Sequence, residues 1–445
     1  MTPTESRQIL RLAVPAFGAL VAEPLYVLYD LAVVGRLGAQ SLAGMAIGGL
    51  ILAQVGAQLT FLAYGTTARS ARLYGSGSRR GAAGEGVQST WLALGIGMAI
   101  VVAMQALAQP VAEIIGGPDI ASIAVEWLRI ALFGVPLILV ALAGSGWLRG
   151  VSDTARPLGY VAAGLVVSAL LCPALVHGWL ILPHLGVPGS AVANVAGQSV
   201  TAVLFLRALL AERVVLRPDF AVMRDQLRLG RDLIARSLGF QVCFLSAGAV
   251  AARFGAAAVG AHQVVLQLWN LIALLLDSIA IAAQALVGAA LGSGRVDEAK
   301  ALAWRLTRWS AVMALVVAAV VAALYGLLPP LLAPDATVVS RAHEVWWILV
   351  ALIPLGGIVF ALDGVLLGAG DAAFLRNITL ASALVGFLPL IWLSFAFDWG
   401  LRGIWAGLGA FITLRVLAVV WRTSSGKWAI AGARVPQVEK GAILD

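Results

Sequence analysis

Long apolar runs with almost no charge are the feature that most limits how this chain can fold. Runs of about 20 apolar residues can cross the roughly 30 Å hydrocarbon core of a bilayer as helices. Because lipid offers no hydrogen-bond partner to the peptide group, each run must satisfy its own backbone. Of 445 residues, 61% are hydrophobic and 12% are charged, about half the charge of a typical soluble domain. A large soluble protein is therefore disfavoured.

Glycine, proline and arginine divide the sequence into twelve such runs, and we predict an all-α membrane protein with twelve transmembrane helices. The predicted spans are residues 9–34, 43–68, 86–109, 121–148, 157–182, 187–209, 232–253, 257–287, 302–328, 340–368, 375–397 and 402–422. Prolines inside these runs predict kinks. The candidates are Pro24, Pro136, Pro173 and Pro354.

The basic residues are distributed unequally between the two sides that these spans define. Of 30 Lys and Arg residues, only five fall on the side opposite the N-terminus, at Arg36, Arg129, Arg253, Arg341 and Arg402. The other 25 share the side of the N-terminus, seven of them in residues 207–236. The positive-inside rule therefore predicts that both termini are cytoplasmic. The net charge of +8 is scattered rather than clustered on one face, so no nucleic-acid partner is expected.

The two halves of the chain repeat each other. GRLGAQSLAG (35–44) returns as ARFGAAAVGA (252–261), and LYGSGSRRGAA (73–83) as ALGSGRVDEAKA (290–301). Two further pairs follow in the same order, Pro136 with Pro354 and GVPGSAVAN (186–194) with GLRGIWAGL (400–408). An offset of 217 separates Arg36 from Arg253, and one of 218 separates the two prolines. Matches in one order at a nearly constant offset indicate an internal duplication.

The duplication predicts two six-helix bundles in the same orientation, a parallel repeat with a central cavity between the halves. We expect an N-terminal bundle at 1–212, a cytoplasmic linker at 213–231, and a C-terminal bundle with a short cytoplasmic tail at 232–445. This architecture favours a carrier that works by alternating access, although a channel or a membrane enzyme can also be duplicated.

The sequences of these motifs, and their order, resemble those of the multidrug and toxic compound extrusion (MATE) family. YDLAVVGRLGAQSLAG (29–44) is similar to its first-helix signature. LDSIAIAAQALVGAALGSG (276–294) and LDGVLLGAGD (362–371) resemble its eighth and tenth helices. The resemblance covers essentially the whole chain, and Asp30 with the helix of Asp277 resembles the DinF-like branch.

Four carboxylates fall well inside predicted spans, at Glu23, Asp30, Asp277 and Asp363. A charge at the bilayer centre costs about 2.5–3.5 kcal/mol on insertion scales, so such groups usually line an ion path or pair with another group. Glu23 and Asp30 are seven residues apart, which returns the second to within roughly 20° of the first on a helix. They are predicted to share one face. Glu23 is adjacent to Pro24, so bonding to a backbone amide freed at a kink is the structural alternative for it.

The family resemblance implies roles for two of these acids. In the family, protonation of the first-helix Asp is linked to substrate release, and that residue matches Asp30. A tenth-helix acid that holds a cation in some members matches Asp363. Those members also place a Glu in the seventh helix, and residues 235–252 contain none. The fifth helix departs as well, since VVSALLCPALV (166–176) has no acid. A sodium cage is therefore incomplete, and H+ is favoured over Na+.

The remaining polar groups inside spans are weaker candidates. Arg236 is interpreted as the one basic group within a span, either a counter-ion for an acid of the C-terminal half or a side chain that snorkels to the headgroups. Cys172 and Cys243 are predicted to be small core residues, and no metal site or cofactor is expected. Uncharged polar residues that line the cavity or bond between helices are Gln54, Gln58, Gln241, Gln263, Gln267 and Asn270.

The sequence as a whole predicts a proton-coupled antiporter that exports amphipathic, often cationic organic compounds. It is expected to act as a monomer in the bacterial inner membrane, with small molecules and the bilayer as partners. The first alternative is a flippase of lipid-linked sugars from the same superfamily of folds, which would need a basic cavity for pyrophosphate. An intramembrane enzyme is a further alternative, but no nucleophile–base set lies at helix depth.

Overall fold

The structure, a computed structural model, describes residues 3–179 and 183–435. Every regular element in this part of the chain is a helix. Twelve of its helical segments are long and apolar enough to cross a membrane, and each corresponds to one predicted span. The chain divides into two compact units, Leu10–Gly230 and Arg231–Asp445, and residues Met1–Ile9 group with the second.

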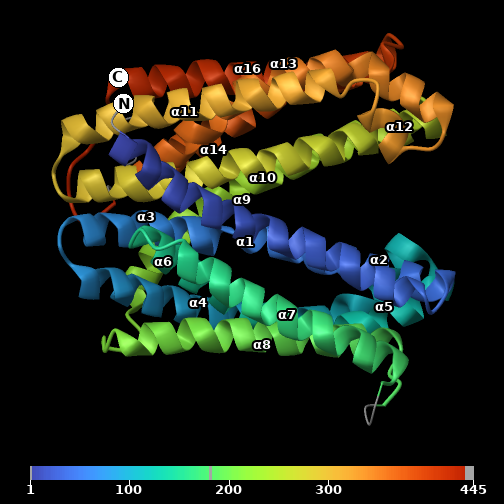
Figure 1. The fold of residues 1–445 in the computed structure, drawn as a ribbon, viewed down its shortest axis with the longest axis horizontal. Helices are drawn as coiled ribbons and strands as arrows, with labels where there is room; N and C mark the ends of the chain where they lie inside the picture. Colours follow the sequence, from blue (N-terminus) through green and yellow to red (C-terminus); the bar gives the residue numbers. More distant parts are fainter. Residues whose placement is uncertain (1–2, 180–182, 436–445) are drawn as a thin grey trace. The chain divides into compact units, whose positions relative to one another are not determined.

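The N-terminal unit holds the first six spans (Figure 1). Its helices are α1 (Pro3–Gly35), α2 (Ala39–Leu59), α3 (Phe61–Gly75), α4 (Arg79–Gly116), α5 (Pro118–Ala131), η1 (Leu132–Gly134), α6 (Val135–Gly150), α7 (Ala155–His177) and α8 (Val187–Ala211). The pair α2 and α3 forms one span, and α5, η1 and α6 together form another. Within this unit α6 packs against α3, α4 and α8.

The C-terminal unit holds the other six spans. Its helices are α9 (Phe220–Arg253), α10 (Ala256–Gly292), α11 (Val296–Ala323), α12 (Leu328–Leu332), α13 (Ala336–Ala369), α14 (Ala372–Ser382), η2 (Ala383–Phe387), α15 (Leu388–Ala396) and α16 (Gly400–Ser425). The start of α9, up to Gly230, groups with the N-terminal unit. In the C-terminal unit α13 packs against α10, α11 and α16. These are the counterparts of the neighbours of α6, so both units have the same internal arrangement.

Turn geometry also repeats between the units. Gly38 and Gly255, 217 residues apart, precede α2 and α10 with φ of 119° and 96°. Gly77 and Gly294, again 217 apart, have φ of 86° and 79° in the turns before α4 and α11. Residues with a Cβ rarely adopt such angles. The glycines that carry the sequence repeat are therefore the ones that the turns require.

A close helix contact within each unit is also duplicated. Gly146 and Gly150 of α6 face α3, where an added Cβ at Gly146 would lie 2.5 Å from the carbonyl oxygen of Ala63. Their repeat mates, Gly364 and Gly368 of α13, meet the backbone of α10 in the same way, with 2.5 Å from a Cβ at Gly368 to the carbonyl oxygen of Gln284. Two small residues four apart let helix backbones approach closely in a membrane.

Much of the predicted linker, residues 213–231, is helical in the structure. Helix α9 begins at Phe220, twelve residues before the predicted span, so the irregular connection from α8 is confined to residues 212–219. The apolar signal starts late because residues 220–231 are rich in charge. Of the predicted kink sites, Pro24, Pro173 and Pro354 lie inside helices. Pro136 instead stands in the first turn of α6, directly after the 3₁₀ turn η1.

Candidate functional site

Asp30 lies in the N-terminal unit, where α1 meets α7 and α8. Its side chain is buried, with 3% of its surface exposed. The thiol of Cys172 donates to Oδ1 at 3.0 Å, and the hydroxyl of Ser190 donates to Oδ2 at 2.8 Å. Among the residues that the structure describes, no basic side chain pairs with this carboxylate. A buried carboxylate held only by neutral donors is a site for a proton or a cation.

A second contact one helical turn away fixes the same pair of helices. The hydroxyls of Tyr26 and Ser168 lie 2.6 Å apart, and Ser168 donates to the carbonyl oxygen of Ala193 at 3.0 Å. Tyr26 precedes Asp30 by four residues, as Ser168 precedes Cys172, so each pair lies on one face of its helix. Two polar contacts in register set the position of α1 against α7.

The hydrogen-bond chain continues beyond Ser190 to α5. The indole Nε1 of Trp127 donates to Ser190 Oγ at 3.2 Å, and Trp127 is 3% exposed. Ser190 thus accepts one hydrogen bond while donating another to Asp30, which fixes the direction of its hydroxyl. Its rotamer is set by Trp127 rather than by solvent.

Glu23 does not share the environment of Asp30, although both belong to α1. Its side chain is exposed rather than buried, and it borders a cavity of about 220 Å³ inside the N-terminal unit. Polar residues that line this cavity with Glu23 are Thr60, Ser145, Arg149, Ser168, Asn194, Gln198 and Thr201. Ser168 both lines the cavity and contacts Tyr26, so it connects this space to the helix face that carries Asp30.

Asp363 of α13 lies in a different setting, within the C-terminal unit. Its Oδ2 accepts hydrogen bonds at 2.5 Å from both Arg236 of α9 and Arg415 of α16. The Asp363 side chain is 7% exposed and that of Arg415 is 4% exposed. Two guanidinium groups on one carboxylate leave one positive charge in excess. This placement assigns Asp363 to a buried ion-pair cluster and makes it a poor cation ligand in this arrangement.

Arg236 is therefore a counter-ion, the first of its two predicted roles. The interpretation of Arg236 as the one basic group within a span was wrong, because Arg415 lies inside the predicted span 402–422 and is buried. Both guanidinium groups also lie over Phe240, at 5.6 Å for Arg236 and 5.1 Å for Arg415. Arg415 was missed because it was counted only for membrane orientation.

The other predicted site residues differ in their exposure. Asp277 of α10 is half-buried. Gln263, Gln267 and Asn270 are exposed on one side of α10, and Gln54 of α2 is exposed as well. Gln58 and Gln241 are half-buried. A cavity-lining role for this set stays a prediction.

Sequence reasoning missed both direct partners of Asp30. Cys172 and Cys243 are buried, as expected of core residues, but Cys172 is also a hydrogen-bond donor to the candidate site. The absence of an acid in residues 166–176 was the available signal, since it required Asp30 to have partners of another kind. Nothing in the sequence distinguishes Ser190 from other serines of the spans.

Fold and site together define a multi-pass membrane protein built from a duplicated six-span unit, with a buried acid in its first helix. The MatE family model matches twice, at residues 15–174 and 233–392, and these two matches are displaced by 218 residues. The chain belongs to the MATE family of multidrug efflux transporters, and is a transporter rather than an enzyme. The predicted duplication is thereby confirmed.

Individual relatives agree with this assignment. The chain is 30% identical to Protein DETOXIFICATION 44, chloroplastic, of Arabidopsis thaliana, over 95% of this chain and 83% of that protein. It is also 30% identical to DNA damage-inducible protein F of Escherichia coli K12, over 96% and 95% of the two chains, which supports the DinF-like branch. A crystal structure of MATE in the bent conformation has a TM-score of 0.87 at 22% identity, with 95% and 96% coverage.

Proposed function

We propose that the protein is a proton-coupled antiporter that exports amphipathic, cationic organic compounds by alternating access. The observation that carries this proposal is the environment of Asp30, a buried carboxylate whose partners are a hydroxyl and a thiol. Ionised, it attracts an organic cation. Protonated, it loses that attraction. Competition between proton and substrate for one carboxylate couples their fluxes, because each ligand stabilises a different state.

Protons are proposed over sodium for two reasons. A sodium site needs several oxygen ligands, whereas one of the two direct partners of Asp30 is a sulfur atom. The acid that the family resemblance assigns to a cation site, Asp363, is held by two arginines. We place both termini in the cytoplasm on the basis of the positive-inside distribution of the basic residues, and we propose that the protein acts as a monomer in a bacterial inner membrane.

The lipid-linked sugar flippase is the second candidate. The positive charge in excess at Arg236, Asp363 and Arg415 is the feature that favours an anionic substrate of this kind. The two candidates differ in cargo, and a cationic dye separates them, because a pyrophosphate carrier has no reason to move one.

Everted membrane vesicles that contain the protein test the proposal. An imposed proton gradient should drive ethidium into the vesicles, and a sodium gradient of equal size should not. Asp30→Asn should abolish this uptake at normal expression. Asp119→Asn removes an exposed carboxylate from the first turn of α5 and should leave uptake within about twofold, as a surface substitution worth less than ~0.5 kcal/mol would. Normal uptake by Asp30→Asn would refute the mechanism.

A further inference from the structure

The connection from α8 to α9 is held against α4 rather than hanging free. Gln88 of α4 donates from Nε2 to the carbonyl oxygen of Arg217 at 3.0 Å, and its Oε1 accepts from the amide of Asp219 at 2.7 Å. The indole of Trp91, one turn further along α4, donates to the carbonyl oxygen of Leu216 at 2.8 Å. Three side-chain hydrogen bonds thus fix the backbone of residues 216–219.

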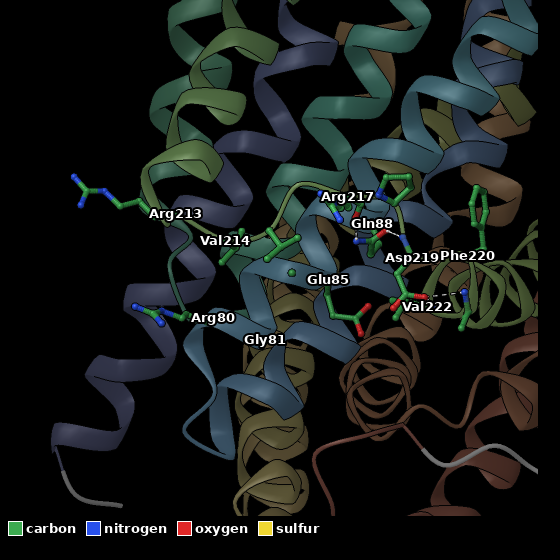
Figure 2. A pocket seen from close by; sticks show the side chains of 14 residues that line it. Arg80, Gly81, Glu85, Gln88, Arg213, Val214, Arg217, Asp219, Phe220 and Val222 are labelled. Atoms are coloured by element: carbon green, nitrogen blue, oxygen red, sulfur yellow. Dashed lines mark hydrogen bonds between the residues drawn. The ribbon is translucent and has the colours of Figure 1, made fainter.

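Residues 213–222 and the start of α4 line a cavity of about 940 Å³, open to the outside, within the N-terminal unit. Figure 2 shows the residues that line it, with Arg80 and Arg213 extending to the same side and Arg217 lying close to Gln88. The volume is at the upper end of the range of about 300–1,000 Å³ that is usual for small-molecule sites. The cavity is therefore large enough for a ligand of many atoms.

The carboxylates that line the cavity already have partners. Glu85 accepts two hydrogen bonds at 2.7 Å from Arg69 and a third at 2.7 Å from Gln226. Asp219 Oδ1 accepts the backbone amides of Ala221 and Val222 at the start of α9. Glu85 is therefore neutralised by Arg69, whereas Asp219 keeps its negative charge because its partners are neutral amides.

The arginines of the cavity, in contrast, are unpaired. Within residues 3–179 and 183–435, the guanidinium groups of Arg80, Arg213 and Arg217 form no ion pair or hydrogen bond, and all three residues are exposed. The neighbouring Arg79 differs, since it forms an ion pair with Glu212 at 2.6 Å. The three arginines outnumber the one unpaired acid of the lining, Asp219, so the cavity has an excess of positive charge that favours an anion. Guanidinium groups suit phosphate oxygens.

Apolar side chains also line the cavity, and most of their surface is exposed, which is unfavourable in water. Val215 is 75% exposed and Phe220 is 76% exposed, and both contribute to the lining. The cavity lies at the start of the α4 span and the end of the α8 span, close to the depth of the lipid headgroups. The lining therefore suits a ligand with an anionic end and an apolar end.

We propose that this cavity binds the headgroup of an anionic phospholipid, which is attracted by the exposed arginines of its lining, Arg80, Arg213 and Arg217. Val215 and Phe220 contact the glycerol backbone and the first acyl carbons. The positive-inside rule accounts for arginines on this side of the membrane. It does not account for a cavity whose connecting backbone is fixed by side-chain hydrogen bonds and whose apolar residues are exposed beside unpaired arginines. Basic pockets between spans on this side are known headgroup sites.

The test measures lipid binding to the purified full-length protein by native mass spectrometry, with phosphatidylglycerol, phosphatidylcholine and inorganic phosphate as separate ligands. The wild type should retain phosphatidylglycerol in preference to the other two. Each arginine near a charged surface contributes about fivefold in affinity, which is ~1 kcal/mol at 1.4 kcal/mol per tenfold. The combined change of Arg80, Arg213 and Arg217 to Gln should weaken phosphatidylglycerol binding up to about 100-fold.

A charge-matched control removes three basic residues elsewhere, by changing Lys300, Arg305 and Arg308 of α11 to Gln. This control should retain the preference for phosphatidylglycerol. Gln88→Ala keeps every charge but frees the connection from α4, and should weaken binding as well. If both triple variants lost phosphatidylglycerol binding equally, the lipid would be attracted to the basic surface in general, and the proposed site would be overturned. Binding of inorganic phosphate as tight as that of the lipid would overturn the lipid assignment, as would wild-type affinity in the cavity variant.

Discussion

Two aspartates of the same kind and similar burial have opposite surroundings. Asp30 and Asp363 are 3% and 5% exposed, yet the first has only neutral hydrogen-bond donors and the second is held by two arginines. Burying a carboxylate costs desolvation free energy, and at Asp363 the ion pairs with Arg236 and Arg415 offset that cost. At Asp30 the only partners are two neutral donors, Cys172 and Ser190, which bring no opposite charge. This difference separates a candidate coupling residue from a structural one.

The cluster around Asp363 gives a prediction on stability. Asp363→Asn should destabilise the protein by about 3–5 kcal/mol, because two buried guanidinium groups then face each other without an anion. The combined change Asp363→Asn with Arg415→Met restores the single positive charge in excess and should recover part of the loss, since residues in one network do not contribute additively. Thermal unfolding of the purified protein measures both effects.

An exposed acid provides the control for this prediction. Asp297→Asn, in the first turn of α11, should change stability by less than ~1 kcal/mol, the usual contribution of an acid near a helix N-terminus. If Asp363→Asn unfolds at the same temperature as the wild type, the ion-pair cluster contributes nothing and Asp363 returns as a candidate coupling acid.

At the scale of elements, the duplicated glycine pairs set how closely helices pack. Gly146 and Gly150 on α6, with Gly364 and Gly368 on α13, place bare backbone against α3 and α10. The site of Asp30 is built from other helices of its unit, α1, α5, α7 and α8, whereas Asp363 is on α13 itself, next to Gly364. The scaffold is thus shared by the two halves, whereas each half places its buried acid on a different helix.

Substitution at these glycines should separate the paired helices. Gly364→Ala and Gly368→Ala should each cost about 1–3 kcal/mol, since the new methyl group meets backbone atoms that cannot move aside. Gly95→Ala on α4 is the matched control, because nothing lies within 4 Å of its added Cβ. That change should be neutral or stabilising by up to ~1 kcal/mol. The measurement is the fraction of monodisperse protein on size-exclusion chromatography, together with the unfolding temperature.

Similar yields and unfolding temperatures for Gly364→Ala and Gly95→Ala would contradict the close approach of α13 to α10. The equivalent changes at Gly146 and Gly150 should reproduce the defect in the N-terminal unit, because their surroundings repeat those of Gly364 and Gly368.

At the scale of the whole molecule, charge distribution predicts orientation. Twenty-five of 30 basic residues share the side of the N-terminus, and twelve spans return the chain to the same side. A green fluorescent protein fused after residue 430 should fluoresce, because it folds in the cytoplasm. Alkaline phosphatase at the same position should be inactive. The same reporters placed in residues 397–399, between α15 and α16, should give the opposite pattern, and active phosphatase at 430 would invert the proposed topology.

The sequence by itself determined the class of fold, the number of spans and the duplication. Hydropathy reports these directly, since lipid forces each apolar run to be a helix and glycines mark the turns. It also identified Asp30 as a candidate, because a carboxylate inside a long apolar run costs free energy on insertion into the membrane, whichever face of the helix carries it.

Only the tertiary structure decided what each polar group contacts. The donors to Asp30 come from Cys172 and Ser190, 142 and 160 residues away along the chain, and the arginines on Asp363 from positions 127 and 52 residues away. The seven-residue spacing of Glu23 and Asp30 placed them on one side of α1, but packing buried only Asp30. Such outcomes depend on which helix faces meet, and periodicity within one helix contains no information about its neighbours.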